Sequence, residues 1–279
     1  MIKIKIEKPF KLDDTITCGQ VFRFYKLEDN SFDIILKDRV INVYEKDNYL
    51  YVSSNNNDNL EEVTRCYFDL DNDYTKMCDY LVKKDKKLIP MIEYSKGLNM
   101  LRQDPFETVI AYIISANNGV PQITNALNLI AKNYGKKVNF NNKEYYLFPQ
   151  YSDLKDLTQE DFRNCKTGFR DKYLKAIIDK LNNNEIDLNE YFSMDTKSAL
   201  EKLMENKGIG MKVASCILLF AYQKYDVFPI DTWVKKIMKE DYNIEGEKNI
   251  REYANKTYGN YSGVAIQYLF NYSRNNKDI

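Results

Sequence analysis

The segment from Met211 to Tyr222 is apolar around nearly the whole circumference of the helix it would form, and Lys212 is its single charged residue. A helix without a polar face has to be buried, so other elements must pack around it. This requirement constrains the fold more than any other feature of the chain. The residues near the two ends of this segment are therefore the main candidates for functional residues.

Gly208 and Gly210 form a turn just before this segment, and residues 194–205 favour another helix before the turn. Glycines allow a tight turn whose backbone N–H groups stay exposed. Together with the N–H groups at the start of the next helix, they can bind a phosphate. This is a helix-hairpin-helix pattern. Taken alone, it is equally typical of a plain helix corner.

Two charged residues make the pattern more informative. Lys212 falls in the first turn of the buried helix, where the helix dipole disfavours a cation and so favours the neutral, nucleophilic amine. Asp231 precedes Thr232 and follows a Phe-Pro-Ile run, a suitable place for the N-cap of a further helix. A carboxylate there could also stabilise a positively charged sugar. The pair suits chemistry at a sugar C1′ atom, although a solvated lysine and a simple cap are the alternatives.

Composition removes several classes of function. The chain has 279 residues, 41 basic and 41 acidic side chains and no histidine, which excludes Ser-His-Asp and Cys-His catalysis and histidine-bound zinc. It contains no apolar run long enough to span a membrane and no signal-peptide core, so we expect a cytoplasmic protein. Five widely spaced cysteines predict free thiols in a reducing compartment. These are Cys18, Cys66, Cys78, Cys165 and Cys216.

The periodicity of the chain predicts an α+β fold in two parts. We expect residues 1–95 to form an antiparallel sheet with flanking helices, and residues 96–279 to form a mostly α-helical domain that carries Lys212 and Asp231. Gly19 precedes the second expected strand, where it favours either a bulge or a close approach of the backbone to a ligand. The expected strands cover residues 1–8, 21–26, 31–37, 39–45 and 49–53.

Three connections in the second part carry polar or aromatic residues. Asn117 lies in a polar corner between two helices, which is either a plain turn or a set of amides that face a ligand. Phe169, in a glycine turn beside Arg170, is either a core residue or an aromatic wedge that enters a base stack. Residues 136–150, rich in tyrosine and asparagine, are expected to form a loop.

The chain resembles the 8-oxoguanine DNA glycosylase/AP lyase family of the helix-hairpin-helix DNA glycosylase superfamily. The resemblance spans most of the chain. Its matching segments are GQVFR (19–23), LRQDPFE (101–107), SANNGV (115–120), GFR (168–170), GIGMKVA (208–214), PID (229–231) and LF (269–270).

The resemblance implies a bifunctional enzyme that flips 8-oxoguanine out of duplex DNA, excises it and nicks the strand by beta-elimination. Lys212 would attack C1′ and form a Schiff base, with help from Asp231. The flipped base would be contacted by four residues, the carbonyl of Gly19, Cys216, Phe270 and Ile266. The residues implied to contact DNA are Asn117, Gln122, Phe169, Arg170, Gly208 and Gly210.

The chain also departs from the family. Gln122 stands where better-known eukaryotic members carry an arginine that reads the opposite cytosine, and Ile266 stands where they carry a glutamine for the base edge. Trp233 replaces a histidine after the catalytic aspartate. These differences predict weaker discrimination of the base opposite the lesion.

No cofactor is expected. Some branches of the superfamily carry an iron–sulfur cluster held by four cysteines after the catalytic aspartate, but no cysteine follows Cys216. The resemblance allows a monovalent cation at the hairpin once DNA is bound, and we expect a monomer. Two rival functions stay open at this point: a glycosylase for alkylated bases, which typically lacks the lysine, and a non-enzymatic DNA-binding module that uses the hairpin only to hold phosphate.

Overall fold

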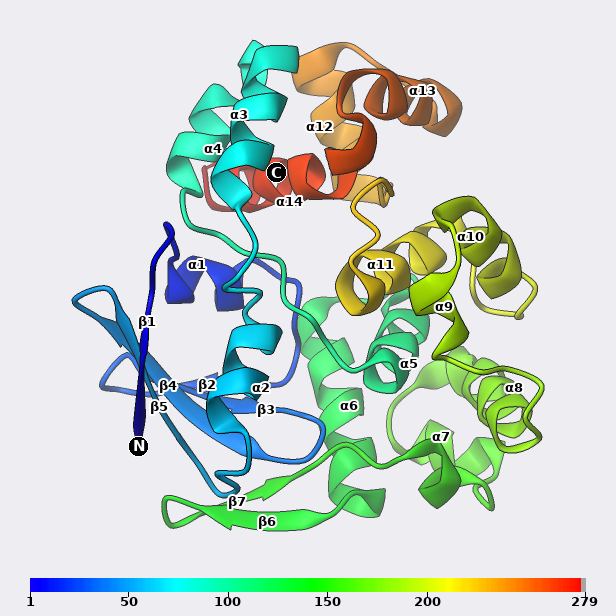
Figure 1. Cartoon of the computed structure of the whole chain (residues 1–279). Helices are drawn as coiled ribbons and strands as arrows, with labels where there is room; N and C mark the ends of the chain where they lie inside the picture. Colours follow the sequence, from blue (N-terminus) through cyan, green and yellow to red (C-terminus); the bar gives the residue numbers. More distant parts are fainter. Residues whose placement is uncertain (277–279) are drawn as a thin grey trace.

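The computed structural model describes residues 1–276, which form an antiparallel sheet beside a larger helical body (Figure 1). The strands are β1 (Ile2–Lys5), β2 (Phe24–Lys26), β3 (Phe32–Ile35), β4 (Val40–Lys46), β5 (Tyr49–Ser54), β6 (Lys137–Phe140) and β7 (Lys143–Tyr146). The helices before residue 135 are α1 (Leu12–Thr17), α2 (Leu60–Tyr67), α3 (Tyr74–Lys84), α4 (Ile89–Tyr94), α5 (Pro105–Ser115) and α6 (Val120–Tyr134). Those after it are α7 (Gln159–Asn164), α8 (Asp171–Asn182), α9 (Glu190–Ser193), α10 (Thr196–Met204), α11 (Met211–Tyr222), α12 (Thr232–Tyr242), α13 (Glu247–Thr257) and α14 (Ser262–Asn276). Short 3-10 helices are η1 (Lys86–Leu88), η2 (Tyr151–Leu154), η3 (Gly168–Arg170) and η4 (Gly259–Tyr261).

The N-terminal sheet has the strand order β1-β5-β4-β3-β2, with antiparallel neighbours throughout. Asp47 and Asn48 both have positive φ and close the β4–β5 turn, as a tight hairpin requires. The prediction of an antiparallel sheet here is confirmed. The second strand begins later than predicted, at Phe24, because α1 comes before it. That helix was not predicted, since its N-cap, Lys11, makes no side-chain capping bond.

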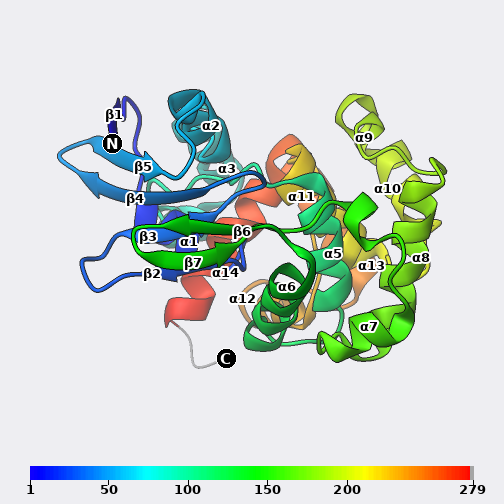
Figure 2. The same ribbon diagram turned by 90° about the horizontal axis from the view of Figure 1, so that it is seen from below.

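The expected loop at residues 136–150 was wrong, because β6 and β7 form a hairpin there. Asn141 and Asn142 occupy its turn with φ of 49° and 58°, the left-handed conformation that asparagine tolerates. The hairpin packs Tyr145 and Leu147 against Ile35 at the edge of the N-terminal sheet. Figure 2 shows it lying alongside β3. It therefore ties the two parts of the chain together.

Helix α11 lies in the interior of the helical body, as its apolar sequence predicted. Every residue from position 213 to 222 is buried, and α5 and α10 pack against the helix. The start of α5 follows the predicted cap, since the Asp104 carboxylate accepts a hydrogen bond from Glu107 N at 3.0 Å and Pro105 occupies the first turn. Together α5 and α11 form the rigid support of the site.

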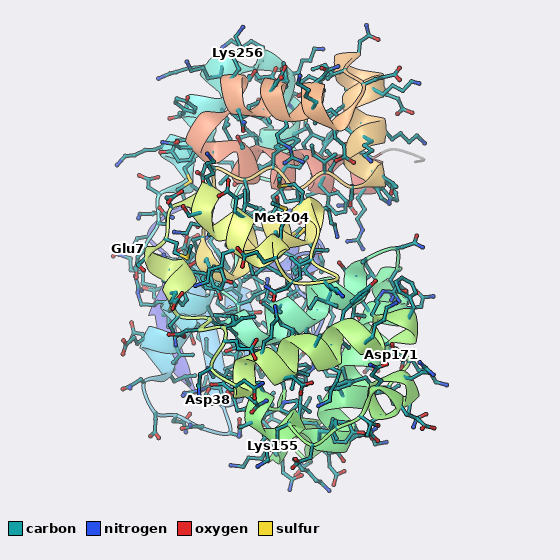
Figure 3. The ribbon with its side chains drawn as sticks, turned by 90° about the vertical axis from the view of Figure 1, so that its right-hand side faces the viewer. Glu7, Asp38, Lys155, Asp171, Met204 and Lys256 are labelled. Carbon is teal, nitrogen blue, oxygen red and sulfur yellow. The ribbon has the colours of Figure 1, made fainter. Side chains whose placement is uncertain are left out.

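Two helices from the first hundred residues and the C-terminal helix form a separate layer. Helices α3 and α4 pack on α14, although they lie far from it in sequence. Figure 3 shows the helices in tiers, with α13 and Lys256 above, α10 and Met204 in the middle, and α8 and Asp171 below. Helix α14 thereby brings residues of the C-terminus against the end of α1. No helix in the described part of the chain has the length and apolar character that crossing a bilayer would require.

Candidate active site

A cavity of about 240 Å³ lies where the segment after α1 meets α5, α6, α11, α12 and α14. Its wall contains every residue that the sequence assigned to catalysis or to the base. These residues are Gly19, Lys212, Cys216, Asp231, Ile266 and Phe270. A larger cavity of about 490 Å³ lies between the sheet and α5, but neither Lys212 nor Asp231 lines it. The chemistry of the smaller cavity makes it the candidate active site.

Lys212 reaches the cavity from the first turn of α11. Its amino group lies 3.1 Å from Ser115 Oγ, at the end of α5, and 5.5 Å from the centre of the Tyr112 ring. The Ser115 hydroxyl donates in turn to the carbonyl of Tyr112 at 2.8 Å, so its lone pairs are directed to the lysine. The amine is therefore held at a defined place on the cavity wall while its side chain stays only half buried.

Asp231 is the N-cap of α12, as predicted. Its Oδ1 atom accepts a hydrogen bond from Val234 N at 2.8 Å, which fixes the carboxylate at the positive end of the helix. The residues before it, Phe228 and Ile230, are buried and anchor the connection from α11. The capping role and a place in the cavity therefore belong to the same side chain.

Cys216 and Phe270 line the cavity from different helices. Cys216 follows Lys212 by one turn of α11, and burial raises the pKa of its thiol to about 11, so the sulfur is neutral near pH 7. Phe270 on α14 is half buried and packs edge-on against Trp233, with ring centroids 6.4 Å apart. Ile266 is buried one turn before Phe270. An apolar ring and a neutral thiol suit a flat, uncharged ligand.

Gly19 lines the cavity opposite these helices, with φ of +91°. A Cβ atom at this position would lie 3.1 Å from Arg274 Nη1 and 3.4 Å from Phe270 Cε1. The glycine follows α1 and is not at the edge of a strand, which corrects the expectation of a strand-edge bulge. Of the two interpretations left open by the sequence, the close approach of backbone to a ligand fits this position.

The helix-hairpin-helix turn has two glycines with different requirements. Gly208 has φ of +91°, and a Cβ atom there would lie 2.5 Å from Cγ of Tyr173, so only glycine fits. Gly210 is the N-cap of α11, and no heavy atom lies within 4 Å of the place its Cβ would take. Buried Ile209 anchors the turn from below. The outer side of the turn is thus open to a phosphate.

Proteins similar to this chain are named as DNA glycosylases and lyases. Residues 1–109 match the model of the 8-oxoguanine DNA glycosylase N-terminal domain. A probable N-glycosylase/DNA lyase of Methanothermobacter thermautotrophicus is 31% identical over 77% of this chain and 75% of its own length. The 8-oxoguanine glycosylase/lyase of Clostridium acetobutylicum, solved with duplex DNA containing cytosine opposite 8-oxoguanine, is 38% identical and has a TM-score of 0.92 over 96% of this chain and 93% of its own.

The chain belongs to the 8-oxoguanine DNA glycosylase family. The resemblance found in the sequence is confirmed. A 3-methyladenine DNA glycosylase structure from Archaeoglobus fulgidus covers 98% of this chain and 99% of its own with a TM-score of 0.82, but at 22% identity this likeness extends to the fold alone. The α+β fold with its N-terminal antiparallel sheet is likewise confirmed.

The DNA-contact residues expected from this family lie on two adjacent corners. Asn117, with φ of +52°, and Gln122 are exposed around the start of α6. Phe169 in η3 is 55% exposed, so it is a surface aromatic and not a core residue. The direct contact of these three residues with DNA stays a prediction.

Arg170 is placed differently from its neighbours. It is only 6% exposed, and its guanidinium group donates to Ala116 O, to Asn117 O at 2.9 Å and to Thr167 O at 3.1 Å. Its CZ atom also lies 4.4 Å from the centre of the Phe169 ring. The arginine thus holds the two corners together from within. Its contact with the opposite cytosine stays a prediction.

Sequence reasoning gave no role to several residues of the cavity. Ser115 and Tyr112 belong to a buried helix whose periodicity predicted only packing, and their proximity to Lys212 depends on how α5 crosses α11. Gln267 lines the cavity beside Ile266. Within residues 1–276, no group of three or more histidine, cysteine, aspartate or glutamate side chains is arranged to hold a metal ion.

Proposed function

We propose that this protein is a bifunctional 8-oxoguanine DNA glycosylase and AP lyase that acts on double-stranded DNA. The observation that carries the proposal is the single cavity lined by Lys212, Asp231 and Gly19. A lysine amine, a carboxylate and an exposed backbone segment meet there without a histidine. This set suits attack on a sugar carbon and recognition of a base, and it does not suit hydrolysis by a serine or cysteine nucleophile.

The reaction begins with the damaged nucleotide outside the helix, because C1′ and the lesion edge are inaccessible in stacked DNA. The flipped base lies between Cys216 and Phe270. The carbonyl of Gly19 accepts a hydrogen bond from N7–H, a donor that 8-oxoguanine has and guanine lacks. Ile266 contacts the base edge through apolar surface.

Lys212 then attacks C1′ in its neutral form. A C1′–N bond forms with the lysine while the bond to the base breaks, and the departing base keeps that electron pair and takes up a proton. The negative charge of Asp231 stabilises the positively charged sugar during this step. The amine loses its proton, the sugar ring opens, and a Schiff base joins Lys212 to C1′. Loss of a C2′ proton then expels the 3′ phosphate and nicks the strand.

The DNA is held mainly through its backbone. The open N–H groups around Gly210 and the start of α11 bind one phosphate. Asn117 enters the space that the flipped base leaves, and Phe169 wedges beside it. The chain has no net charge, so this grip depends on local geometry. We propose that the reaction uses no resident cofactor and that a monovalent cation can join the hairpin with DNA.

The cellular location follows from the substrate. An enzyme that acts on chromosomal DNA has to work where the chromosome is. We propose the cytoplasm, in association with the nucleoid if the source is prokaryotic.

Borohydride trapping on an 8-oxoguanine duplex tests the proposed function. Reduction of the Schiff base gives a stable protein–DNA adduct, which we expect from the wild-type protein and not from Lys212→Gln. The variant is expected to keep DNA binding, because Lys212 faces the cavity and not the hairpin surface.

Each rival function has its own outcome in the same assay. An enzyme that excises 3-methyladenine but not 8-oxoguanine, with no trapped adduct, is an alkylated-base glycosylase. Binding to duplex DNA with no excision of either lesion identifies a non-enzymatic module. Full excision by Lys212→Gln refutes the nucleophile.

A further inference from the structure

Gln20 follows the base-reading glycine and is completely buried. Its side-chain amide donates to Thr15 O and to Asn99 O, both at 2.8 Å, and its Oε1 atom accepts from Leu101 N at 2.8 Å. A buried amide with its donors and acceptor paired holds a single orientation. The residue on one side of Gly19 is therefore fixed to the N-terminus of the helical part.

Gln103, in the connection before α5, ties the same segment to α11. Its side chain donates to the carbonyl of Gln20 at 2.7 Å, and its backbone N–H donates to Phe220 O near the end of α11 at 3.0 Å. One residue therefore connects the helix that carries Lys212 to the segment that carries Gly19. Gln103 is half buried and lies outside the catalytic cavity, so it acts on the site only through these contacts.

Gln267 fixes the other side of the glycine. Its side chain donates to the carbonyl of Cys18 at 3.1 Å from α14, where it lies between Ile266 and Phe270. Cys18 is itself fully buried and donates its backbone N–H to Asp14 O at 3.1 Å. The carbonyl groups of both neighbours of Gly19, Cys18 and Gln20, are thus anchored, while Gly19 stays partly exposed to the cavity.

We propose that Gln20, Gln103 and Gln267 are positioning residues that set the direction of the Gly19 carbonyl and thereby determine the preference for the oxidised base. The inference rests on the proposed function, because it needs the carbonyl to be the acceptor for N7–H. Glycine has more backbone freedom than any other residue, so a glycine carbonyl makes a precise reader only when its neighbours are held. Gln20 and Gln103 supply that restraint through the connection before α5, and Gln267 supplies it from α14.

We call Gln20, Gln103 and Gln267 the clamp. If the clamp acts in this way, base reading can be weakened without loss of the chemistry at C1′. Gln103→Met keeps the length of the side chain and removes the one donor to Gln20 O. We expect single-turnover excision of 8-oxoguanine to fall about tenfold, the effect of one net hydrogen bond. Nicking of a duplex with a preformed abasic site should not change, because that substrate has no base for the carbonyl to read.

Two further variants complete the experiment. Gln267→Met should also lower excision of 8-oxoguanine, since it releases the Cys18 carbonyl on the other side of Gly19. Gln159→Met, at an exposed position on α7, should equal wild type on both substrates. Equal loss of both activities in Gln103→Met would identify a purely structural residue, and no loss would show that the carbonyl needs no clamp. Either result overturns the proposal.

Failure of the proposed function is distinguishable from failure of the clamp. A wild-type protein that does not excise 8-oxoguanine refutes the function itself, whatever the variants do. A wild-type protein active on both substrates, together with unchanged glutamine variants, leaves the function standing and removes only the clamp.

Discussion

Lys212 and Asp231 each take their position from the start of a helix, whereas Gly19 takes its position from contacts with distant parts of the chain. The hairpin places Lys212 in the first turn of α11, and the cap to Val234 N places Asp231. The segment around Gly19 is anchored to the connection before α5 and to α14. The residues of the proposed chemistry are therefore positioned by local sequence, whereas the residue of the proposed base recognition is positioned by tertiary contacts. This difference predicts that the two can be damaged separately.

Asp231→Asn should have the largest effect on chemistry and almost none on folding. Asparagine caps a helix as well as aspartate does, so the change in stability should be a few tenths of a kcal/mol. The loss of the negative charge should lower single-turnover excision by about 10²- to 10³-fold. Asp231→Ala should lose the cap as well, at a cost of about 1 kcal/mol in the free energy of unfolding. If Asp231→Asn remains fully active, the carboxylate is only a cap.

Gly19→Ala should damage recognition and spare the lyase step. Alanine at φ of +91° is strained by about 1–2 kcal/mol, and its methyl group would lie only 3.1 Å from Arg274 Nη1. The shift of the Gly19 carbonyl that relieves this strain should lower 8-oxoguanine excision by about 10- to 100-fold. Nicking of a preformed abasic site is the control measurement. Parallel loss of both activities would mean that the glycine supports the whole cavity and does not read the base.

The same contrast explains what sequence could predict. Helix starts carry local signals, so Lys212 in the hairpin helix and the Asp231 cap were both identified from a few neighbouring residues. Positions matched through the family, such as Cys216 and Phe270, line the same cavity as Lys212 although they come from different helices, and their contact with the base stays a prediction. The bonds that hold Gly19 were not predicted, because Gln267 is 249 positions from Cys18 and nothing in either segment signals the other.

Other misses have the same cause. The partners of Arg170 are backbone carbonyls at the end of α5, which have no sequence signature, so its burial was not foreseen. The β6–β7 hairpin was missed although Asn141 and Asn142 form a good turn, because its strands are short and gain stability from packing on the N-terminal sheet. Elements that depend on a distant partner are those that a local pattern cannot predict.

Phe169→Ala tests the proposed wedge, which would open the duplex and so serve both base recognition and chemistry. The side chain is mostly exposed, so stability should change by less than about 0.5 kcal/mol. Loss of the wedge should weaken binding to a lesion duplex by about tenfold, as for the loss of one aromatic stacking contact. Phe192, which is 52% exposed and lies outside the cavity, provides the matched control. Equal binding by Phe169→Ala and Phe192→Ala would remove the wedge assignment.

Recognition of the opposite strand should be weaker than recognition of the lesion. Gln122 is exposed in the first turn of α6, where an arginine would be needed for bidentate reading of a base. The activation free energies of excision from duplexes with C, A, G or T opposite the lesion should therefore differ by less than about 1 kcal/mol. A bidentate contact would give ~1–3 kcal/mol. Gln122→Arg should raise the preference for cytosine. A strong preference in wild type would contradict the expectation.

The smallest expected effect concerns the thiol that shares α11 with Lys212. Burial raises the pKa of Cys216 from 9.0 to about 11, so the folded state holds its proton where the unfolded state releases it. Its stabilising contribution is complete below pH 9 and is lost as the pH rises through 11. At pH 10 the free energy of unfolding should fall by about 1 kcal/mol and Tm by about 2–4 °C.

Thermal unfolding of wild type and Cys216→Ala between pH 7 and pH 10 measures this effect. The variant should lose less stability than wild type over that range, although it starts lower because the cavity wall is smaller. Cys66→Ala, which removes an exposed cysteine, is the control. If Cys216→Ala and wild type lose the same stability, burial does not hold the proton on the Cys216 thiol to the higher pH expected here.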